Sequence, residues 1–542
     1  MRASFRTKYF ILATGILVNL YAHSQNLEQA IKLTRNEQFE KADKAFRVLI
    51  SGDPANGKLY FYEGENFFDW GKMDSAKANY QRGITLNATN ALNYVGLGKV
   101  QWYSNDGKDA IDNFYKAKVL SKSKDAIVLD KIAEAYINAP SKDIGSAIDL
   151  LNQAVLLEPN NADICIDMGD AYLARNDGSN AVTYYEKATT INPKSALGTL
   201  RLGQLYSRAR NYDLSYQYFQ QATQIDSTFA PAYREKAEML EAAQRFDDAI
   251  AQYKKYLQLN DAINARIRYA SFLFLAKKYP DAISELQKVL VQDTNDIILY
   301  RLMAYSQYET GNYKDGITNM NKFFAKATIA NMKTLPSDYA YQGKLLSKVG
   351  QDSLAVEKLK QALQKDTSSD VGELYSQIGN IYFKDGKYAQ AVKYFQVRTN
   401  LPQPTVNDYN ALGRAAYSSR QYQKADSAFA VITKYMADLP LGYLWRARSN
   451  SLIDSLTTQG LAVPYYKQYA QKVGADTIRN KTDLVEAYTY IAYYYYLQKD
   501  KENTENYYKR ALALDPNNVQ AKTYFESLKA PKQPPMKKEG TK

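Results

Sequence analysis

The chain has 542 residues, a formal net charge of +13 and 23% charged residues, with acidic and basic side chains interleaved throughout. Cys165 is the only cysteine, which excludes an internal disulfide. His23 is the only histidine and lies in a segment that we expect to be removed, so the mature chain should lack Ser-His-Asp triads and histidine-bound zinc. The even spread of charge and the expected export both argue against nucleic acid as a partner.

Residues 1–24 have the pattern of a secretory signal peptide. Three basic residues precede an apolar run at residues 9–20, and the small residues Ala22 and Ser24 have the spacing of a cleavage site. The run is too short for a permanent transmembrane helix, and no cysteine follows it as a lipoprotein acylation site. We therefore expect a mature chain that starts near Gln25, has no membrane span, and resides in the periplasm or in association with the outer membrane.

Small residues recur with a fixed spacing along the rest of the chain. Twelve times, a small residue is followed by another one 12 positions later, as in Gly64 and Ala76 or Gly413 and Ala425, and most pairs recur about every 34 residues. That period is typical of a helix–turn–helix repeat whose two helices cross closely where both side chains are small.

Residues 162–195 contain one complete unit, with further defined positions besides the small pair. In order, these positions are Gly169, Tyr172, Ala181, Tyr185, Ala188 and Pro193. The layout resembles the tetratricopeptide repeat family over roughly residues 26–525, in about fourteen units, although the family's usual Trp at the fourth position is replaced by residues such as Cys165. The resemblance implies an all-α, right-handed superhelical solenoid over residues 25–528.

The C-terminal part follows the pattern less closely from about residue 440. Ala447 pairs with Ala462 at a spacing of 15, and extra residues at 322–338 and 451–484 predict longer helices or surface loops. Residues 519–528 should form a helix that caps the open end of the solenoid. The basic, Pro-containing tail at 529–542 is predicted to be disordered.

The resemblance also implies where partners bind, because the first helix of each repeat lines the concave groove. The side chain after the small residue points into this groove, which predicts a change from acidic positions such as Asp170 and Glu238 to basic ones further along. We predict that the C-terminal half binds an acidic peptide segment through cationic and aromatic side chains. The predicted groove residues are Arg301, Tyr305, Tyr308, Lys344, Asn380, Arg414, Tyr417 and Arg448.

A second pattern concerns covalent modification. An Asp followed by Ser or Thr and then an apolar residue or Thr is similar to the O-glycosylation sequon of exported Bacteroidota proteins. The candidate acceptors are Ser75, Ser227, Ser353, Ser427, Ser455 and Thr477. Asp and Ser are also favoured at helix starts and turns, so both interpretations stay open.

No phosphate-binding loop, dinucleotide fingerprint, nucleophile elbow or calcium loop occurs in the sequence. We therefore predict no catalytic residue, no metal site and no cofactor. The favoured function is a non-enzymatic scaffold or adaptor of the bacterial periplasm or cell envelope whose partners are other proteins. A glycan-binding module is the alternative, because Tyr and Trp faces stack on sugar rings. The partner's identity and the oligomeric state stay open.

Overall fold

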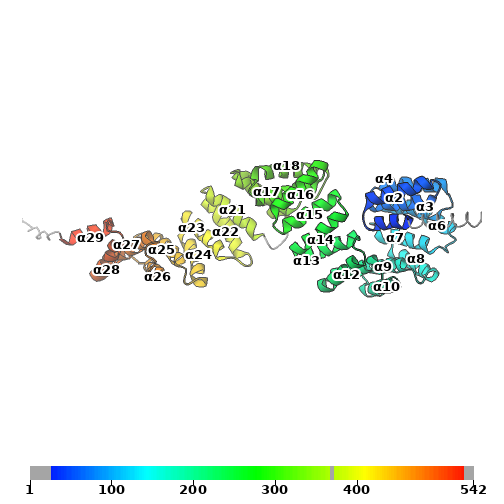
Figure 1. Cartoon of the computed structure of the whole chain (residues 1–542). Coiled ribbons are helices and arrows are strands. Elements are labelled where there is room, and N and C mark those ends of the chain that lie inside the picture. Colours follow the sequence, from blue (N-terminus) through cyan, green and yellow to red (C-terminus); the bar gives the residue numbers. More distant parts are fainter. Residues whose placement is uncertain (1–25, 367–370, 530–542) are drawn as a thin grey trace, which may run out of the picture. The chain divides into compact units, whose positions relative to one another are not determined.

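The computed structural model describes residues 26–366 and 371–529 (Figure 1). The expected signal peptide and residues 530–542 of the expected tail lie outside the described residues. Within them the chain forms 29 helices and no strand, as the repeat pattern predicts. The chain divides after Ser306 into two compact units, which we call the N-terminal unit and the C-terminal unit.

The N-terminal unit consists of successive helical hairpins. A first helix covers residues 26–35. It is followed by α2 (Phe39–Gly52), α3 (Gly57–Asp69), α4 (Met73–Leu86), α5 (Ala91–Tyr103), α6 (Gly107–Leu120), α7 (Ala126–Asn138), α8 (Ile144–Leu157), α9 (Ala162–Ala174), α10 (Gly178–Ile191), α11 (Ala196–Arg208), α12 (Tyr212–Ile225), α13 (Ala230–Ala242), α14 (Phe246–Leu259), α15 (Ile263–Leu275) and α16 (Tyr279–Gln292). Helix α17 (Ile297–Glu309) crosses the boundary between the units.

The C-terminal unit continues the same hairpin pattern. Its helices are α18 (Tyr313–Ile329), α19 (Pro336–Lys348), α20 (Asp352–Lys365), α21 (Gly372–Lys384), α22 (Tyr388–Asn400), α23 (Val406–Ser418), α24 (Tyr422–Tyr435), α25 (Pro440–Ile453), α26 (Val463–Val473), α27 (Lys481–Leu497), α28 (Lys501–Leu514) and α29 (Val519–Lys529).

The small residues of the repeat are explained by an aromatic ring that packs directly on them. A Cβ atom added to Gly169 would lie 2.3 Å from the ring of Tyr185, and one added to Gly413 would lie 2.6 Å from that of Phe429. Both rings are fully buried. The second helix of a hairpin can therefore approach the first only where the first carries no large side chain.

The ends of the helices also follow from the sequence. In the α9–α10 hairpin, Asn176 adopts a left-handed conformation (φ 61°), which Asn tolerates better than most residues. The Asp177 side chain then accepts a hydrogen bond from the backbone N–H of Asn180 and caps α10. Pro193 prevents continuation of α10 beyond Ile191.

The regions of extra sequence at residues 322–338 and 451–484 contain a longer helix and loops, the two features predicted for them. Helix α18 has 17 residues, and a loop separates it from α19. Between α25 and α26, Asp454 is buried and its carboxylate accepts backbone N–H bonds from Thr458, Gln459 and Gly460, which orders that loop. Helix α29 is present at the expected capping position.

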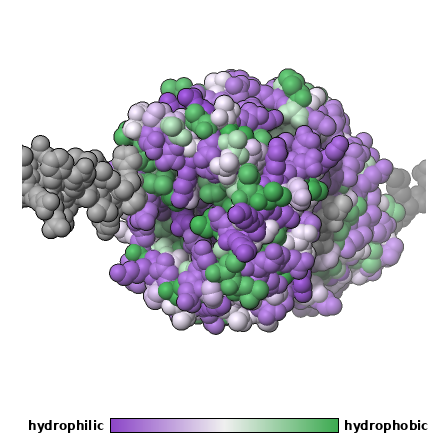
Figure 2. Space-filling model, turned by 90° about the vertical axis from the view of Figure 1, so that its right-hand side faces the viewer, coloured by the Kyte–Doolittle hydropathy of each residue, from purple (hydrophilic) through white to green (hydrophobic). Residues whose placement is uncertain are grey.

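The face drawn in Figure 2 is mostly hydrophilic, with apolar side chains exposed in small groups. None of the helices formed by the described residues combines the length and apolarity that crossing a bilayer requires.

Candidate partner-binding grooves

Tyrosine hydroxyl groups link the packed core of the N-terminal unit to the predicted groove positions. The Tyr80 ring packs on Gly64, and its hydroxyl donates to Glu65, the next residue on α3, over 2.5 Å. Tyr185 donates in the same way to Asp170 over 2.6 Å. Burial and the adjacent carboxylate raise the pKa of both phenols. The groove acids at these two positions are therefore held by the core and do not move freely in solvent.

Lys99 on α5 is the centre of a buried charge network between three neighbouring helices. Its ammonium lies 3.0 Å from Glu65 of α3 and 2.9 Å from Glu134 of α7, and its side chain is 4% exposed. Glu134 also pairs with Lys131. Although burial opposes ionisation, the two ammonium groups hold the pKa of Glu134 well below its usual range.

A cavity of about 310 Å³ lies beside this network, lined by the first helix, α2, α3, α7, α9 and α11. Six carboxyl groups line it, compared with three cationic side chains. Burial raises the pKa of Asp167 on its wall, and raises that of the neighbouring Asp130 to about 6. The excess of carboxyl groups and their burial therefore make ionisation of Asp167 less favourable than in water.

Ion pairs between the first helices of successive repeats continue along the groove of the N-terminal unit. Arg201 of α11 pairs with Asp170 of α9 at 2.9 Å, and Arg268 of α15 pairs with Glu238 and Glu241 of α13. The expectation of an acidic N-terminal groove is therefore too simple, because a base from the next helix neutralises these acids.

The first helix and the turn after it contact repeats far along the chain. Arg35 pairs with Asp163 of α9 at 2.7 Å, and Lys32 pairs with Asp226 at 2.9 Å. Glu37 pairs with Arg234 of α13 at 2.9 Å. We call these contacts, with the two below, the N-terminal clasp.

Two hydrogen bonds add to the clasp. Tyr256 of α14 donates to Glu37 over 2.8 Å, and Asn36 donates to Thr228 over 3.1 Å. The partners in the clasp are separated by 128 to 219 residues in sequence. The start of the N-terminal unit is thus fastened to its own later repeats.

Of the predicted groove residues, Arg301 and Tyr305 lie on the part of α17 that belongs to the N-terminal unit. Tyr305 is 7% exposed and packs on Phe274 at 5.9 Å between ring centroids. Its ring therefore contributes mainly to packing. Arg301 is half-buried.

Tyr308 and Lys344 come together in the C-terminal unit. The Lys344 ammonium lies 5.9 Å from the ring centroid of Tyr308 and 5.4 Å from that of Tyr341, and it pairs with the exposed Glu373 at 2.9 Å. Tyr308 and Tyr341 meet edge to face at 5.6 Å. This arrangement forms a half-exposed cationic and aromatic surface.

Asn380, Arg414 and Tyr417 lie on α21 and α23. Asn380 and Arg414 are exposed, and the Arg414 guanidinium stands 5.7 Å from the ring centroid of Phe383. Within the described residues, Arg414 makes no ion pair. Tyr417 is half-buried and meets Trp445 edge to face at 5.1 Å. Arg414 is therefore a cation that is available to an external anion.

Arg448 on α25 is placed differently. Its guanidinium pairs with Glu486 at 2.6 Å and with Asp483 at 2.7 Å, and it lies over Trp445. The hydrogen bond to Glu486, followed by the Coulomb attraction of both acids, outweighs burial and raises its pKa. Glu486 also accepts from Tyr466. Arg448 thus already has two anionic partners within the chain, which the sequence pattern did not indicate.

The candidate glycosylation residues differ in exposure. Ser227, Ser353, Ser427 and Ser455 are exposed, whereas Ser75 and Thr477 are half-buried. Asp454, which precedes Ser455, accepts the backbone N–H bonds that order the loop between α25 and α26. No group of three or more His, Cys, Asp or Glu side chains suited to a metal ion occurs among the described residues.

Comparison with known proteins connects these features to a family. Tetratricopeptide repeat models match residues 141–201 and 240–304, residues 200–264, and residues 372–396 and 485–518. A solved structure, the C-terminal part of a TPR repeat-containing protein from Cytophaga hutchinsonii, is 35% identical over 47% of this chain and 98% of its own, with a TM-score of 0.40. The chain belongs to the tetratricopeptide repeat family.

Other similar structures are more distant. The Pseudomonas aeruginosa protein pilF is 20% identical over 39% of this chain and 94% of its own, with a TM-score of 0.28. The APC/C hetero-tetramer Cut9-Hcn1 matches at 13% identity over 92% of this chain and 94% of its own, with a TM-score of 0.32. No curated protein matches the sequence. Tetratricopeptide repeat proteins generally act as protein-interaction scaffolds, and their fold is typically non-catalytic.

Proposed function

We propose that this tetratricopeptide repeat protein is a non-enzymatic adaptor of the bacterial cell envelope, and that it binds an acidic segment of a partner protein in the groove of its C-terminal unit. The observation that carries the proposal is Arg414, an exposed guanidinium beside the Phe383 ring that has no ion-pair partner within the described residues. A carboxylate from a partner would gain a charge-assisted hydrogen bond there without displacing an internal one.

Neighbouring side chains support the same choice of ligand. Lys344 is held at two tyrosine rings, and its ion-pair partner among the described residues is the exposed Glu373. A partner carboxylate could replace Glu373 at small cost. Exposed Asn380 and half-buried Tyr417 add hydrogen-bonding groups and contact area. By contrast, the charged groove residues of the N-terminal unit described above are largely paired with each other.

The test is in-cell crosslinking of the tagged chain in its native envelope, with captured proteins and crosslinked positions identified by mass spectrometry. Arg414→Glu and Lys344→Glu should lower partner capture strongly. Lys393→Glu on α22, an exposed charge reversal outside the groove, should leave capture unchanged. Equal capture by all four proteins would reject the groove of the C-terminal unit as the docking site. Recovery of glycan without protein would favour the glycan-binding alternative.

The envelope location is part of this proposal and has its own test. We expect the natively produced protein to begin near Gln25 after signal removal and to be released with the periplasmic or outer-membrane fraction. Its intact mass would report both the cleavage and any glycan at the candidate Ser and Thr residues. A mass equal to the uncleaved, unmodified 542-residue polypeptide would contradict export and glycosylation together.

A further inference from the structure

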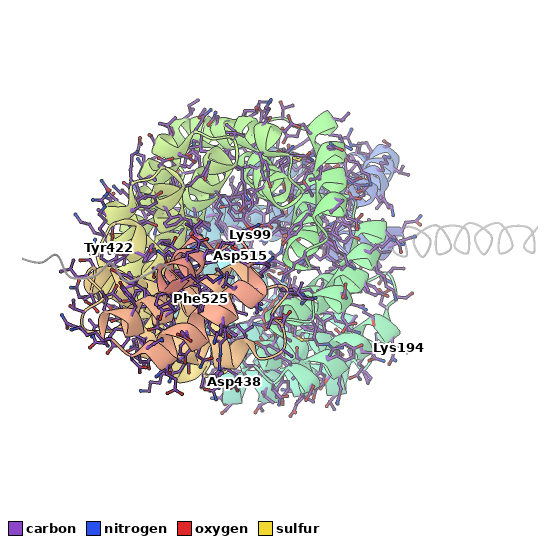
Figure 3. All side chains as sticks on the ribbon, turned by 90° about the vertical axis from the view of Figure 1, so that its left-hand side faces the viewer. Lys99, Lys194, Tyr422, Asp438, Asp515 and Phe525 are labelled. Carbon is purple, nitrogen blue, oxygen red and sulfur yellow. The ribbon has the colours of Figure 1, made fainter. Side chains whose placement is uncertain are left out.

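Two lysines among the described residues are more than nine-tenths buried, and their surroundings differ in charge. Lys99, which is labelled in Figure 3, is 3% exposed and pairs with Glu65 and Glu134, as described above. Lys236 of α13 is 5% exposed, and it forms no ion pair within the part of the chain that the structure describes. Burying an ammonium group without an opposite charge is costly. Lys236 therefore lacks the compensation that Lys99 has.

The position of Lys236 in the repeat is occupied by apolar side chains in the two preceding units. Leu202 and Met168 stand one and two repeat lengths before it, and both are buried. An apolar side chain at this position fills the space between helices without the cost of removing a charge from water. A residue that gives up this stability at a packing position is expected where a protein has a functional site.

Two further cations and two tyrosine rings lie near Lys236. Its ammonium is 3.9 Å from the ring centroid of Tyr216 on α12, and the guanidinium of Arg245, at the start of α14, is 5.6 Å from the same centroid. Lys255 of α14 lies 5.8 Å from the ring centroid of Tyr233 on α13. Burial lowers the pKa of Lys236, and the charges of Lys255 and Arg245 add to this shift, although Tyr216 opposes it. We call these five residues the Lys236 cluster.

The acidic side chains of α13 and α14 pair with cations other than Lys236 and Lys255. These acids are Glu235, Glu238, Glu241, Asp247 and Asp248. On α12, Asp213 is exposed and pairs with neither lysine. Lys255 is exposed and has no ion-pair partner in the described ranges. The cluster therefore contains two ammonium groups that no carboxylate of these three helices pairs with.

We propose that the Lys236 cluster binds a phosphate monoester group. Such a group carries about −1.5 to −2 charges at neutral pH, which matches the two ammonium groups of Lys236 and Lys255, whereas a carboxylate would neutralise one of them. Its oxygens accept charge-assisted hydrogen bonds from both lysines. The exposed pair of Arg245 with Asp248 can exchange its carboxylate for phosphate at small cost. The inference does not rest on the proposed partner-binding function.

Isothermal titration calorimetry with inorganic phosphate tests the site, with sodium chloride added to keep the ionic strength constant. The unmodified protein should bind phosphate saturably, and Lys236→Met should weaken binding about tenfold or more, because it removes a charge-assisted hydrogen bond. Since Met168 is buried at the equivalent position, this variant should keep the fold, which thermal unfolding can verify. Lys187→Met, at an exposed position on α10, removes the same charge and should leave the affinity unchanged. Equal affinity in all three proteins, or no binding by the unmodified protein, would overturn the proposal.

Amine-specific labelling followed by mass spectrometry locates the bound phosphate. Lys255 is exposed and should react several-fold more slowly when inorganic phosphate is present, whereas the exposed Lys187 should react at the same rate. The protection of Lys255 should disappear in Lys236→Met. Equal protection of Lys255 and Lys187, or protection of neither, would show that phosphate does not occupy the cluster and would overturn the proposal.

Vesicles of phosphatidylcholine with and without phosphatidic acid distinguish two sources of the phosphate group. Co-sedimentation that requires phosphatidic acid and is lost in Lys236→Met would support the site and identify a lipid headgroup as its ligand. Binding of inorganic phosphate without co-sedimentation would support the site and identify a soluble phosphate monoester instead.

Discussion

The two units use the same repeat in different ways. In the N-terminal unit, Lys99, Arg201 and Arg268 each pair with acids of neighbouring first helices, and the clasp fastens the first helix to later repeats. In the C-terminal unit, Arg414 faces solvent beside an aromatic ring. A groove whose charges are satisfied internally stiffens the solenoid, whereas one with an available cation can recognise an anionic partner. The small and aromatic positions of the repeat do not determine whether the charges of the groove are paired or available. The side chains that line the groove determine this.

The largest effect should come from breaking the buried network of the N-terminal unit. Lys99→Met leaves Glu65 and Glu134 without their shared ammonium, and removing one partner from a buried network typically costs about 3–5 kcal/mol. Urea unfolding should show the loss, together with faster hydrogen exchange in α3, α5 and α7. Lys108→Met, at an exposed position on α6, is the control and should stay within about 0.5 kcal/mol. An unchanged midpoint for Lys99→Met would mean that the network contributes no net stability.

Glu63 on α3 offers the opposite case, a buried carboxyl with neither an ion pair nor a hydrogen bond in the described residues. Burial, followed by repulsion from Asp43, raises its pKa to about 7, although Arg47 and Arg82 oppose the shift. A raised pKa means that folding favours the protonated form of Glu63. The stability that this carboxyl contributes is therefore fully present below pH 4.5 and is lost as the pH rises through 7.

Glu63→Gln should therefore stabilise the protein by about 3 kcal/mol at pH 8 and have little effect at pH 4. Urea midpoints measured at both pH values check this difference. Glu186→Gln, an exposed substitution on α10, provides the comparison and should show no such pH dependence. Equal stabilisation by Glu63→Gln at both pH values would show that the carboxyl is not titrating as described.

Breaking the clasp should have a smaller and more local effect. Glu37→Gln weakens the contacts to Arg234 and Tyr256, which are partly open to solvent, so we expect a loss of about 1 kcal/mol. Hydrogen exchange should become several-fold faster in residues 26–35. Glu40→Gln, an exposed neighbour on α2, should leave it unchanged. If exchange in the first helix stays slow in both variants, packing rather than the clasp holds that helix.

The features that depend on contacts within one repeat, or between adjacent repeats, could be predicted from the sequence. The pairing of Gly169 with Tyr185, the stop at Pro193 and the capping helix α29 each follow from local chemistry and a period of about 34 residues. The pairs of Lys99 with Glu65 and Glu134 were also accessible in principle, because their separations of 34 and 35 residues match that period.

The clasp could not be predicted in this way. Glu37 meets Arg234 and Tyr256 across 197 and 219 residues. Such a contact depends on the rotation added by each repeat, and small differences accumulate over several units. The partners of Arg448 were obscured for another reason, because the extra residues between α25 and α27 shift the register that would have aligned it with Glu486.

The smallest effect on stability should accompany the largest effect on binding. Arg414→Ala removes a side chain that is exposed and has only a ring contact, so the urea midpoint should change by no more than the equivalent of about 0.5 kcal/mol. Arg448→Ala should lower the midpoint further, since it leaves Glu486 and Asp483 without their cation. Capture of the partner should follow the reverse order, with Arg414→Ala the more damaging. If Arg414→Ala instead destabilised the fold and spared capture, the C-terminal groove would resemble the N-terminal one, and the difference between the two units would have to lie outside their grooves.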